Sequence, residues 1–284
     1  MVKSKFTKNE ILKIYTEEYL KNNKSTLALD REYNMGKGYF SRQFKKYNLK
    51  MKTHSEATRK YNVNHNYFEN IDTPEKAYWL GFIYADGYIT TSNTTKRIGI
   101  SLAVKDKNHL NNFSKCVESN YPIREYKVVS GFKTGIKYCR VIINSNKMFD
   151  DLRKLGVVEN KSLILKPPSI PKDLIKYFIL GYFDGDGSIC IKNHYDRKTK
   201  DWSFSLCGTK EILNFIMDYF IENNLVIKRN KLDKKHEDSS VCQITYGGNN
   251  VERILTHLYD GFNKEICLRR KYELYIKCKN KQWN

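Results

Sequence analysis

WLGFIYADGYI, residues 79–89, returns 100 residues later as ILGYFDGDGSI, residues 179–189. Each copy is an apolar stretch that predicts a helix and ends in an aspartate, Asp86 in the first copy and Asp186 in the second. Small residues four positions apart share one helix face, so two such helices could approach closely. These small residues are Gly81 and Ala85 in the first copy, and Gly181 and Gly185 in the second. Close approach would bring the two carboxylates together, and adjacent carboxylates favour a divalent cation of the kind that activates water against a phosphodiester. The repeat therefore predicts a metal-dependent nuclease with two similar halves.

The repeat extends beyond this phrase, because residues 138–165 align with residues 241–268 at an offset of 103. In the first half, apolar periodicity predicts a helix at 74–85, strands after Gly87 and at 97–104, a helix at 106–118, strands at 123–129 and 137–144, and a helix at 146–155. In the second half it predicts a helix at 172–184, strands at 188–192 and 202–207, a helix at 209–223, strands at 225–232 and 241–246, and a helix at 249–259. Each half is therefore expected to have the order αββαββα.

The first 70 residues differ from these halves in composition. Ser25 is placed to cap a short helix, a glycine-containing turn follows at residues 34–38, and residues 39–50 read as a strongly basic helix. Helix, turn and basic helix is the layout of a helix-turn-helix, which predicts DNA contacts from Arg42, Lys45 and Lys46. The plainer alternative is a basic helical pair that packs on the rest of the protein. The expected parts of the chain are residues 1–70, the first half at 71–165, a linker at 166–172 and the second half at 173–284.

The composition favours a polyanionic partner. The 284 residues include 51 Lys and Arg against 31 Asp and Glu, a net charge of +20, which suits a phosphate backbone. A ribosome-associated or membrane-surface protein is the alternative, but the basic residues are spread along the chain among 21 tyrosines. No stretch has the apolar length of a membrane span or the pattern of a signal peptide, so a soluble intracellular protein is expected. The seven cysteines form no CxxC pair, which disfavours a disulfide framework or a zinc site.

Both repeated phrases resemble the LAGLIDADG motif, and the chain from about residue 73 onward is similar to single-chain, two-motif LAGLIDADG homing endonucleases. The N-terminal segment resembles helix-turn-helix units attached to some phage- and intron-encoded members of that family. The resemblance implies an α+β fold in which two pseudo-symmetric αββαββα halves form a DNA-binding saddle, with a small all-α domain before them. It implies a monomer in the cytoplasm of a bacterial or phage-infected cell, or in an organelle matrix.

The resemblance also implies a chemistry. Family members cleave both strands of a long double-stranded DNA site with Mg²⁺ or another divalent cation such as Mn²⁺, which here would be held by Asp86 and Asp186. Lys161 and Lys264, in matching Asn-Lys pairs of the repeat, fall where the family places a catalytic basic residue. The alternative for both lysines is a solvated surface position.

The sequence departs from the family phrase at the sixth position of the motif. The first copy has Tyr84 there, whereas the second keeps an acid, Asp184. That position is usually structural in the family, so the departure puts the symmetry of the halves in doubt rather than cleavage. We expect Asp184 to lie at a helix end, facing solvent or a basic neighbour.

Base recognition is expected on the strands and the polar loops between them, because basic side chains there can reach base edges or phosphates. The candidates are Arg97, Lys133, Arg197, Lys198 and Lys200.

Two other functions remain open on the same fold. An RNA splicing maturase would bind intron RNA, although maturases of this family often lose a motif acid and both acids are present here. A non-catalytic DNA-binding regulator would bind an operator without a metal.

Overall fold

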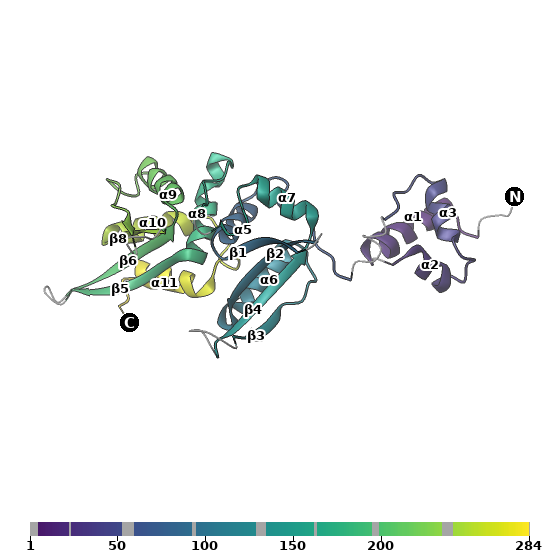
Figure 1. Ribbon diagram of the computed structural model, residues 1–284, viewed down its shortest axis with the longest axis horizontal. Helices are drawn as coiled ribbons and strands as arrows, with labels where there is room; N and C mark the ends of the chain where they lie inside the picture. Colours follow the sequence, from purple (N-terminus) through teal and green to yellow (C-terminus); the bar gives the residue numbers. More distant parts are fainter. Residues whose placement is uncertain are drawn as a thin grey trace. The chain divides into compact units, whose positions relative to one another are not determined.

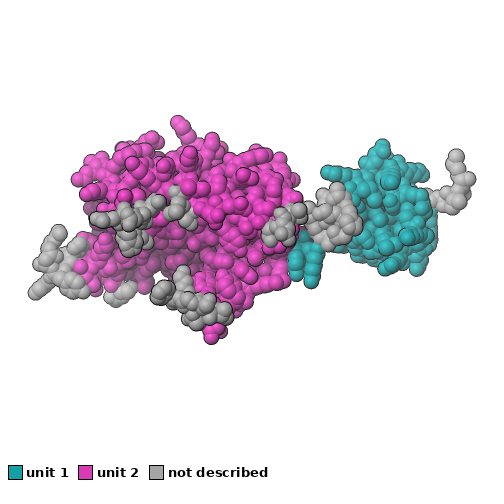
Figure 2. All heavy atoms as spheres, in the orientation of Figure 1, with its two compact units in different colours: residues 1–61 teal, residues 62–284 magenta. Residues whose placement is uncertain are grey.

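The computed structural model describes residues 5–22, 24–52, 60–92, 95–128, 135–161, 164–194, 199–234 and 241–283. The chain divides into two compact units, residues 1–61 and residues 62–284, which are coloured separately in Figure 2. Val63 and Phe68 belong to the core of the second unit, and the Asn64 backbone N–H donates to the Val117 carbonyl oxygen at 2.9 Å. Residues 62–70, which composition groups with the N-terminal segment, therefore pack with the second unit.

The first unit is a small helical body with an aromatic core of its own. It contains α1 (Lys8–Ile14), a π-helical segment (Tyr15–Lys21), α2 (Thr26–Glu32) and α3 (Tyr39–Lys46). The Ser25 hydroxyl caps α2 by accepting from the Ala28 backbone N–H at 3.1 Å. Buried Asp30 accepts from the backbone N–H groups of Gly38 at 2.6 Å and Phe40 at 3.0 Å, so it fixes the turn that leads into α3.

The second unit contains two copies of one plan (Figure 1). The first copy consists of α5 (Pro74–Ala85), β1 (Gly87–Ser92), β2 (Thr95–Ala103), α6 (Lys107–Cys116), β3 (Arg124–Lys127), β4 (Lys137–Asn144) and α7 (Asn146–Lys154). The second consists of α8 (Ile175–Asp186), β5 (Gly187–His194), β6 (Thr199–Gly208), α9 (Lys210–Glu222), β7 (Asp233–Lys234), β8 (Cys242–Gly247), α10 (Asn249–Tyr259) and α11 (Arg269–Lys279). The antiparallel sheets have the orders β1-β2-β4-β3 and β5-β6-β8-β7. The α+β fold with N-terminal helices is confirmed.

Each sheet buries one face and leaves the other polar, as the period-2 pattern of its strands requires. In the first sheet, Ile98 pairs with Ile143 on the buried face, while the neighbouring Arg97 pairs with Asn144 on the open face. In the second sheet, buried Phe204 lies between Ile189 and Tyr246.

In the second unit, two elements differ from the sequence prediction. Residues 225–232 form no strand, because Leu225 closes α9 instead: its backbone N–H bonds the Phe220 carbonyl oxygen at 2.9 Å and its side chain is buried. The unexpected element is α11, which packs Tyr275 in a stacked contact on Tyr259 of α10, with ring centroids 4.8 Å apart. No helix in the described part of the chain is long and apolar enough to cross a membrane.

Candidate active site

The centre of the second unit is the contact between α5 and α8, the two helices of the repeated phrase. A Cβ built on Gly81 would stand 1.9 Å from the Phe178 carbonyl oxygen, and one on Gly181 would stand 1.9 Å from the Tyr78 carbonyl oxygen. No real Cβ atom tolerates such a distance, so the backbones meet directly at both glycines. The reciprocal pair of contacts relates the two halves by a pseudo-twofold axis.

The same contact continues to the carboxyl ends of both helices. A Cβ on Gly185 would lie 2.2 Å from the Ala85 Cβ, so these two small residues also face each other. Asp86 caps α5 directly after Ala85, and Asp186 is the last residue of α8. Asp86 is half-buried and Asp186 is exposed. The packing of small residues therefore brings both carboxylates out at the same end of the helix pair.

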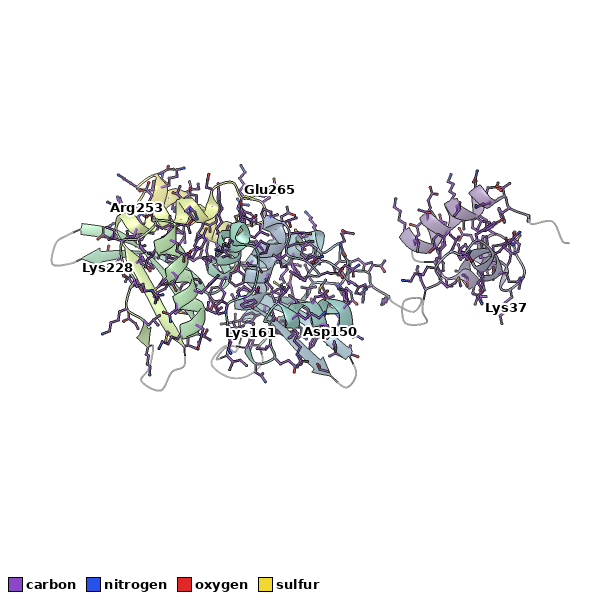
Figure 3. The ribbon with its side chains drawn as sticks, turned by 90° about the horizontal axis from the view of Figure 1, so that it is seen from above. Lys37, Asp150, Lys161, Lys228, Arg253 and Glu265 are labelled. Carbon is purple, nitrogen blue, oxygen red and sulfur yellow. The ribbon has the colours of Figure 1, made fainter. Side chains whose placement is uncertain are left out.

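A buried lysine occupies the end of each of these helices. The Lys161 ammonium, labelled in Figure 3, donates to the Tyr84 carbonyl oxygen at 2.7 Å and to the Ala85 carbonyl oxygen at 2.5 Å. The Lys271 ammonium donates to three carbonyl oxygens of α8: Phe183 at 2.5 Å, Asp184 at 2.8 Å and Gly185 at 3.3 Å. A helix end leaves the last carbonyls, here those of Tyr84, Ala85, Asp184 and Gly185, without intrahelical partners, and they carry the negative end of the helix dipole. The Phe183 carbonyl oxygen also accepts the backbone N–H of Gly187. Each lysine is thereby held within one turn of its half's motif aspartate.

The ionisable groups at this end of the helix pair shift one another's pKa values. Burial raises the pKa of the Asp86 carboxyl, and the positive charges of Lys271, Lys161 and Arg270 oppose that rise. Burial lowers the pKa of Lys271 to about 8, although the Asp184, Asp86 and Asp186 carboxylates favour its charged form. Burial also lowers the pKa of Lys161, against the pull of Asp186 and Asp86. Both ammonium groups therefore interact electrostatically with both motif aspartates, so the sets of groups at the two helix ends are coupled.

The solvent-facing alternative for Asp184 was wrong, whereas the basic neighbour is present in Lys271, whose charge favours the ionised carboxyl. Its side chain is fully buried and accepts hydrogen bonds from the Tyr78 hydroxyl at 2.6 Å, the Tyr259 hydroxyl at 3.1 Å and the Leu268 backbone N–H at 2.8 Å. The reason is the segment leading into α11, which covers the end of α8 and was absent from the predicted plan. Tyr84, the residue at the same motif position in α5, donates its hydroxyl hydrogen to the Leu155 carbonyl oxygen at 2.5 Å.

Lys264 and Lys271 occupy different environments. Lys264 is exposed, in the segment before α11, whereas Lys271 makes the contacts that correspond to those of Lys161. A constant offset of 103 pairs Lys161 with Lys264, and it misses Lys271 because α11 places its lysine 110 residues after Lys161. The sequence does contain a signal: Lys271 lies on the helical stripe of Leu268, Tyr275 and Cys278, where an apolar residue is expected. A catalytic role for Lys264 stays a prediction.

No family model and no curated protein matches the sequence. Among solved structures, the chain is similar to the meganuclease I-CpaMI bound to uncleaved DNA, at 12% identity over 73% of this chain and 91% of that chain, with a TM-score of 0.49. It is similar to I-AabMI bound to uncleaved DNA at 13% identity, over 73% of this chain and 90% of that one, with a TM-score of 0.47. It is similar to I-GzeII in complex with its DNA target at 11% identity, over 74% and 91% of the two chains, with a TM-score of 0.46. All three are LAGLIDADG nucleases. A function for this chain therefore rests on its own residues.

The candidate DNA-contacting residues lie in three kinds of place. Arg42, Lys45 and Lys46 are exposed on α3, and Lys200 is exposed on β6. Arg97 is partly buried on the open face of the first sheet. The remaining candidates lie outside the described residues: Lys133, Arg197 and Lys198.

The open face of the first sheet carries two further arginines that sequence reasoning missed. Arg124 of β3 pairs with Arg140 of β4 and both are exposed, with the Arg140 guanidinium 4.9 Å from the centroid of the Tyr126 ring. Arg140 alternates with the apolar residues of KYCRVIIN, which is the signal that could have identified it.

The donor set suits a divalent cation only in part. Within the described ranges, no group of three or more His, Cys, Asp or Glu side chains could hold a metal ion. Asp86 and Asp186 nevertheless provide hard carboxylate oxygens from two helices that end side by side. Mg²⁺ commonly takes one or two carboxylates and fills its other positions with water and substrate phosphates. The residues present therefore fit a cation that binds together with a phosphate.

Proposed function

We propose that this chain is a site-specific DNA endonuclease, a single-chain member of the LAGLIDADG homing endonuclease family, which cleaves both strands of a long target by metal-dependent hydrolysis. The observation that carries the proposal is the reciprocal glycine contact of Gly81 and Gly181, which sets two carboxylates at one end of a helix pair. A buried lysine at the end of each helix completes two similar sets of groups, one for each strand of a duplex.

The charge of the molecule supports DNA as the substrate. The net charge of +20 favours a polyanion, and the open face of the first sheet carries Arg97, Arg124 and Arg140. Arginine side chains on the open face of a sheet can contact both DNA phosphates and base edges. In the first unit, the basic side chains of α3 supply a second candidate surface for the same partner.

The aspartates and the lysines of the site would have different catalytic roles. Asp86 and Asp186 would hold Mg²⁺ or a similar cation jointly with a DNA phosphate, and the bound cation would polarise the phosphate and lower the pKa of a water molecule. The Lys161 and Lys271 ammonium groups, fixed by main-chain carbonyl oxygens, offer preorganised positive charge where negative charge grows in the transition state. Because the pKa of Lys271 is about 8, its ammonium can also give up or regain a proton near neutral pH.

Selection of cleaved sites from a randomised duplex library in Mg²⁺ tests the proposal directly. We expect one family of long sites, cut on both strands, with no products in EDTA or with an Asp86→Asn, Asp186→Asn double variant. Binding to a duplex without cleavage in either Mg²⁺ or Mn²⁺ would support a non-catalytic regulator. Selective binding of intron RNA without DNA cleavage would support a maturase.

A further inference from the structure

The sixth residue of the motif differs between the copies, but its partners are related. In α5, the Tyr84 hydroxyl donates to the carbonyl oxygen of Leu155 at 2.5 Å. In α8, the Asp184 carboxylate accepts from the backbone N–H of Leu268 at 2.8 Å. Both side chains thus leave their own helix and bond the main chain of a later segment.

These later segments are the ones that carry the buried lysines. Leu155 is the C-cap of α7, six residues before Lys161. Leu268 is the N-cap of α11, three residues before Lys271, and its carbonyl oxygen accepts from the Lys271 backbone N–H at 2.9 Å. A shift of either leucine would therefore move the chain that delivers an ammonium to the end of a motif helix.

The chemistry of each partner accounts for the broken symmetry. A helix C-cap presents a carbonyl oxygen, so Tyr84 meets Leu155 with a hydroxyl donor. Leu268 presents an N–H group, so Asp184 meets it with an acceptor. Tyrosine and aspartate thus perform one task on opposite ends of two helices.

We propose that Tyr84 and Asp184 are positioning residues, each anchoring the segment that brings its half's lysine to the site. The inference rests on the proposed function, because the placement of a lysine affects strand cleavage only if the lysine acts there. Each side chain anchors its segment through a leucine backbone rather than through a hydrogen bond to the lysine ammonium, and the Asp184 carboxylate in addition attracts the charge of Lys271.

The surroundings of Asp184 show that its carboxylate does more than fill space. It is 0% exposed, and it accepts from Tyr78 of α5 and Tyr259 of α10 as well as from Leu268. Burying a carboxylate in such a place is costly, and an apolar side chain would pack there without that cost. The carboxylate gathers α5, α10 and the start of α11 around the end of α8, and this contact fixes Leu268.

Strand-resolved cleavage tests the inference on the full-length protein. Each strand of one duplex target is labelled separately, and the nicking rate of each strand is measured for the wild type, Tyr84→Phe and Asp184→Leu. We expect each variant to slow one strand relative to the other by about 10- to 100-fold, because a misplacement of about 1 Å can cost about 10²-fold in rate. The two variants should slow opposite strands. Asp184→Asn keeps an acceptor oxygen for the Leu268 N–H and should recover most of the rate that Asp184→Leu loses.

Tyr182→Phe is the matched control for Tyr84→Phe. Its buried hydroxyl also leaves a motif helix to bond a backbone carbonyl, that of Cys207 at 2.9 Å, but Cys207 lies in β6 rather than in a lysine-bearing segment. The wild-type ratio of strand rates is expected for this control. Equal slowing of both strands by Tyr84→Phe, or a bias of the same size in Tyr182→Phe, would overturn the inference.

A second readout needs neither metal nor DNA. Amide hydrogen exchange in the free protein should rise across residues 266–272 in Asp184→Leu and across 155–161 in Tyr84→Phe, with little change in the opposite segment. Unchanged exchange in both would overturn the anchoring whatever the cleavage result. If the wild type cut neither strand, the proposed function would fail while the exchange data still decided the anchoring. If Asp184→Leu did not fold, the two tyrosine variants would decide.

Discussion

Gly181 lies directly against Tyr78, so that a Cβ on the glycine would stand 1.9 Å from the Tyr78 carbonyl oxygen. Tyr78 is in α5 and Gly181 is in α8, and the reciprocal contact joins Gly81 to Phe178. The distance between the helix axes is therefore limited by backbone atoms rather than by side chains. Asp86 and Asp186 owe their common position to this contact.

Replacement of Gly181 by alanine should cost about 1–3 kcal/mol in the free energy of unfolding and most of the cleavage rate, because the clash is with backbone that cannot rotate away. Gly181→Val should cost more. Gly247→Ala is the control, since a Cβ there would meet only the Trp202 carbonyl oxygen at 3.9 Å. Urea denaturation and cleavage assays measure both effects. A Gly181→Ala protein as stable and active as Gly247→Ala would mean that the helices do not meet at this glycine.

Asp86→Asn and Asp186→Asn should each abolish double-strand cleavage while leaving DNA binding within a few-fold of the wild type. Asparagine keeps the shape of the side chain but removes the charge that a hard divalent cation requires. Gel-shift titration in Ca²⁺ gives the affinity, and plasmid cleavage in Mg²⁺ gives the activity. Near-normal cleavage by either variant would show that its carboxylate is not needed at the site.

Lys271→Met should slow cleavage by about 10²-fold or more, the loss that follows removal of one preorganised group that stabilises transition-state charge. Lys264→Met is the paired variant, because its side chain is exposed while that of Lys271 is buried against α8. Single-turnover rates at saturating enzyme compare the two variants without interference from binding. A larger loss in Lys264→Met than in Lys271→Met would return the catalytic assignment to Lys264.

His109 should make the second unit sensitive to mild acid. Burial lowers the pKa of His109 to about 3, helped by the positive charges of Arg270 and Lys271. The unfolded chain binds a proton on this histidine near pH 6.5 and the folded protein does not. The contribution of neutral His109 to the free energy of unfolding is therefore fully present above about pH 6.5 and is lost as the pH drops toward 3. Between pH 6.5 and pH 5, protonation of this one group in the unfolded chain should lower the free energy of unfolding by about 2 kcal/mol.

The matched variant for this effect is His109→Phe, which removes the titrating group. Urea unfolding at pH 7 and pH 5 should show a smaller acid-induced loss in the variant than in the wild type. The difference between the two losses isolates His109 from the carboxylates that also titrate. Equal losses would show that His109 is not held neutral in the folded protein.

Deletion of residues 1–61 should leave a folded second unit that binds DNA more weakly and with a shallower dependence on salt. The deletion follows the boundary between the two compact units, each of which has a core of its own. Fewer basic groups on phosphates release fewer counterions, which lowers the slope of log affinity against log salt. An identical slope for the two proteins would indicate that α3 does not contact the duplex.

The α+β architecture follows from local patterns in the chain. Period-2 alternation in KRIGISLA places Ile98, Ile100 and Leu102 on one face of β2, and the apolar run before Asp86 allows a fully buried helix. The repeated phrase also indicates which small residues meet, because small residues four apart share one helix face and allow a second helix to approach closely. These features depend on neighbouring residues, so a single sequence contains them.

The position of the second lysine was decided only by the tertiary structure. Lys271 reaches the end of α8 because α11 packs on α10 through Tyr259 and Tyr275, and because Asp184 holds Leu268 at the start of α11. None of these contacts joins residues that are close in sequence, and Lys264, not Lys271, is the lysine that satisfies the repeat pattern. The repeat in the sequence shows which residues correspond between the two halves. Burial and hydrogen bonding between distant segments determine that the Lys271 ammonium, and not that of Lys264, lies near Asp86 and Asp186.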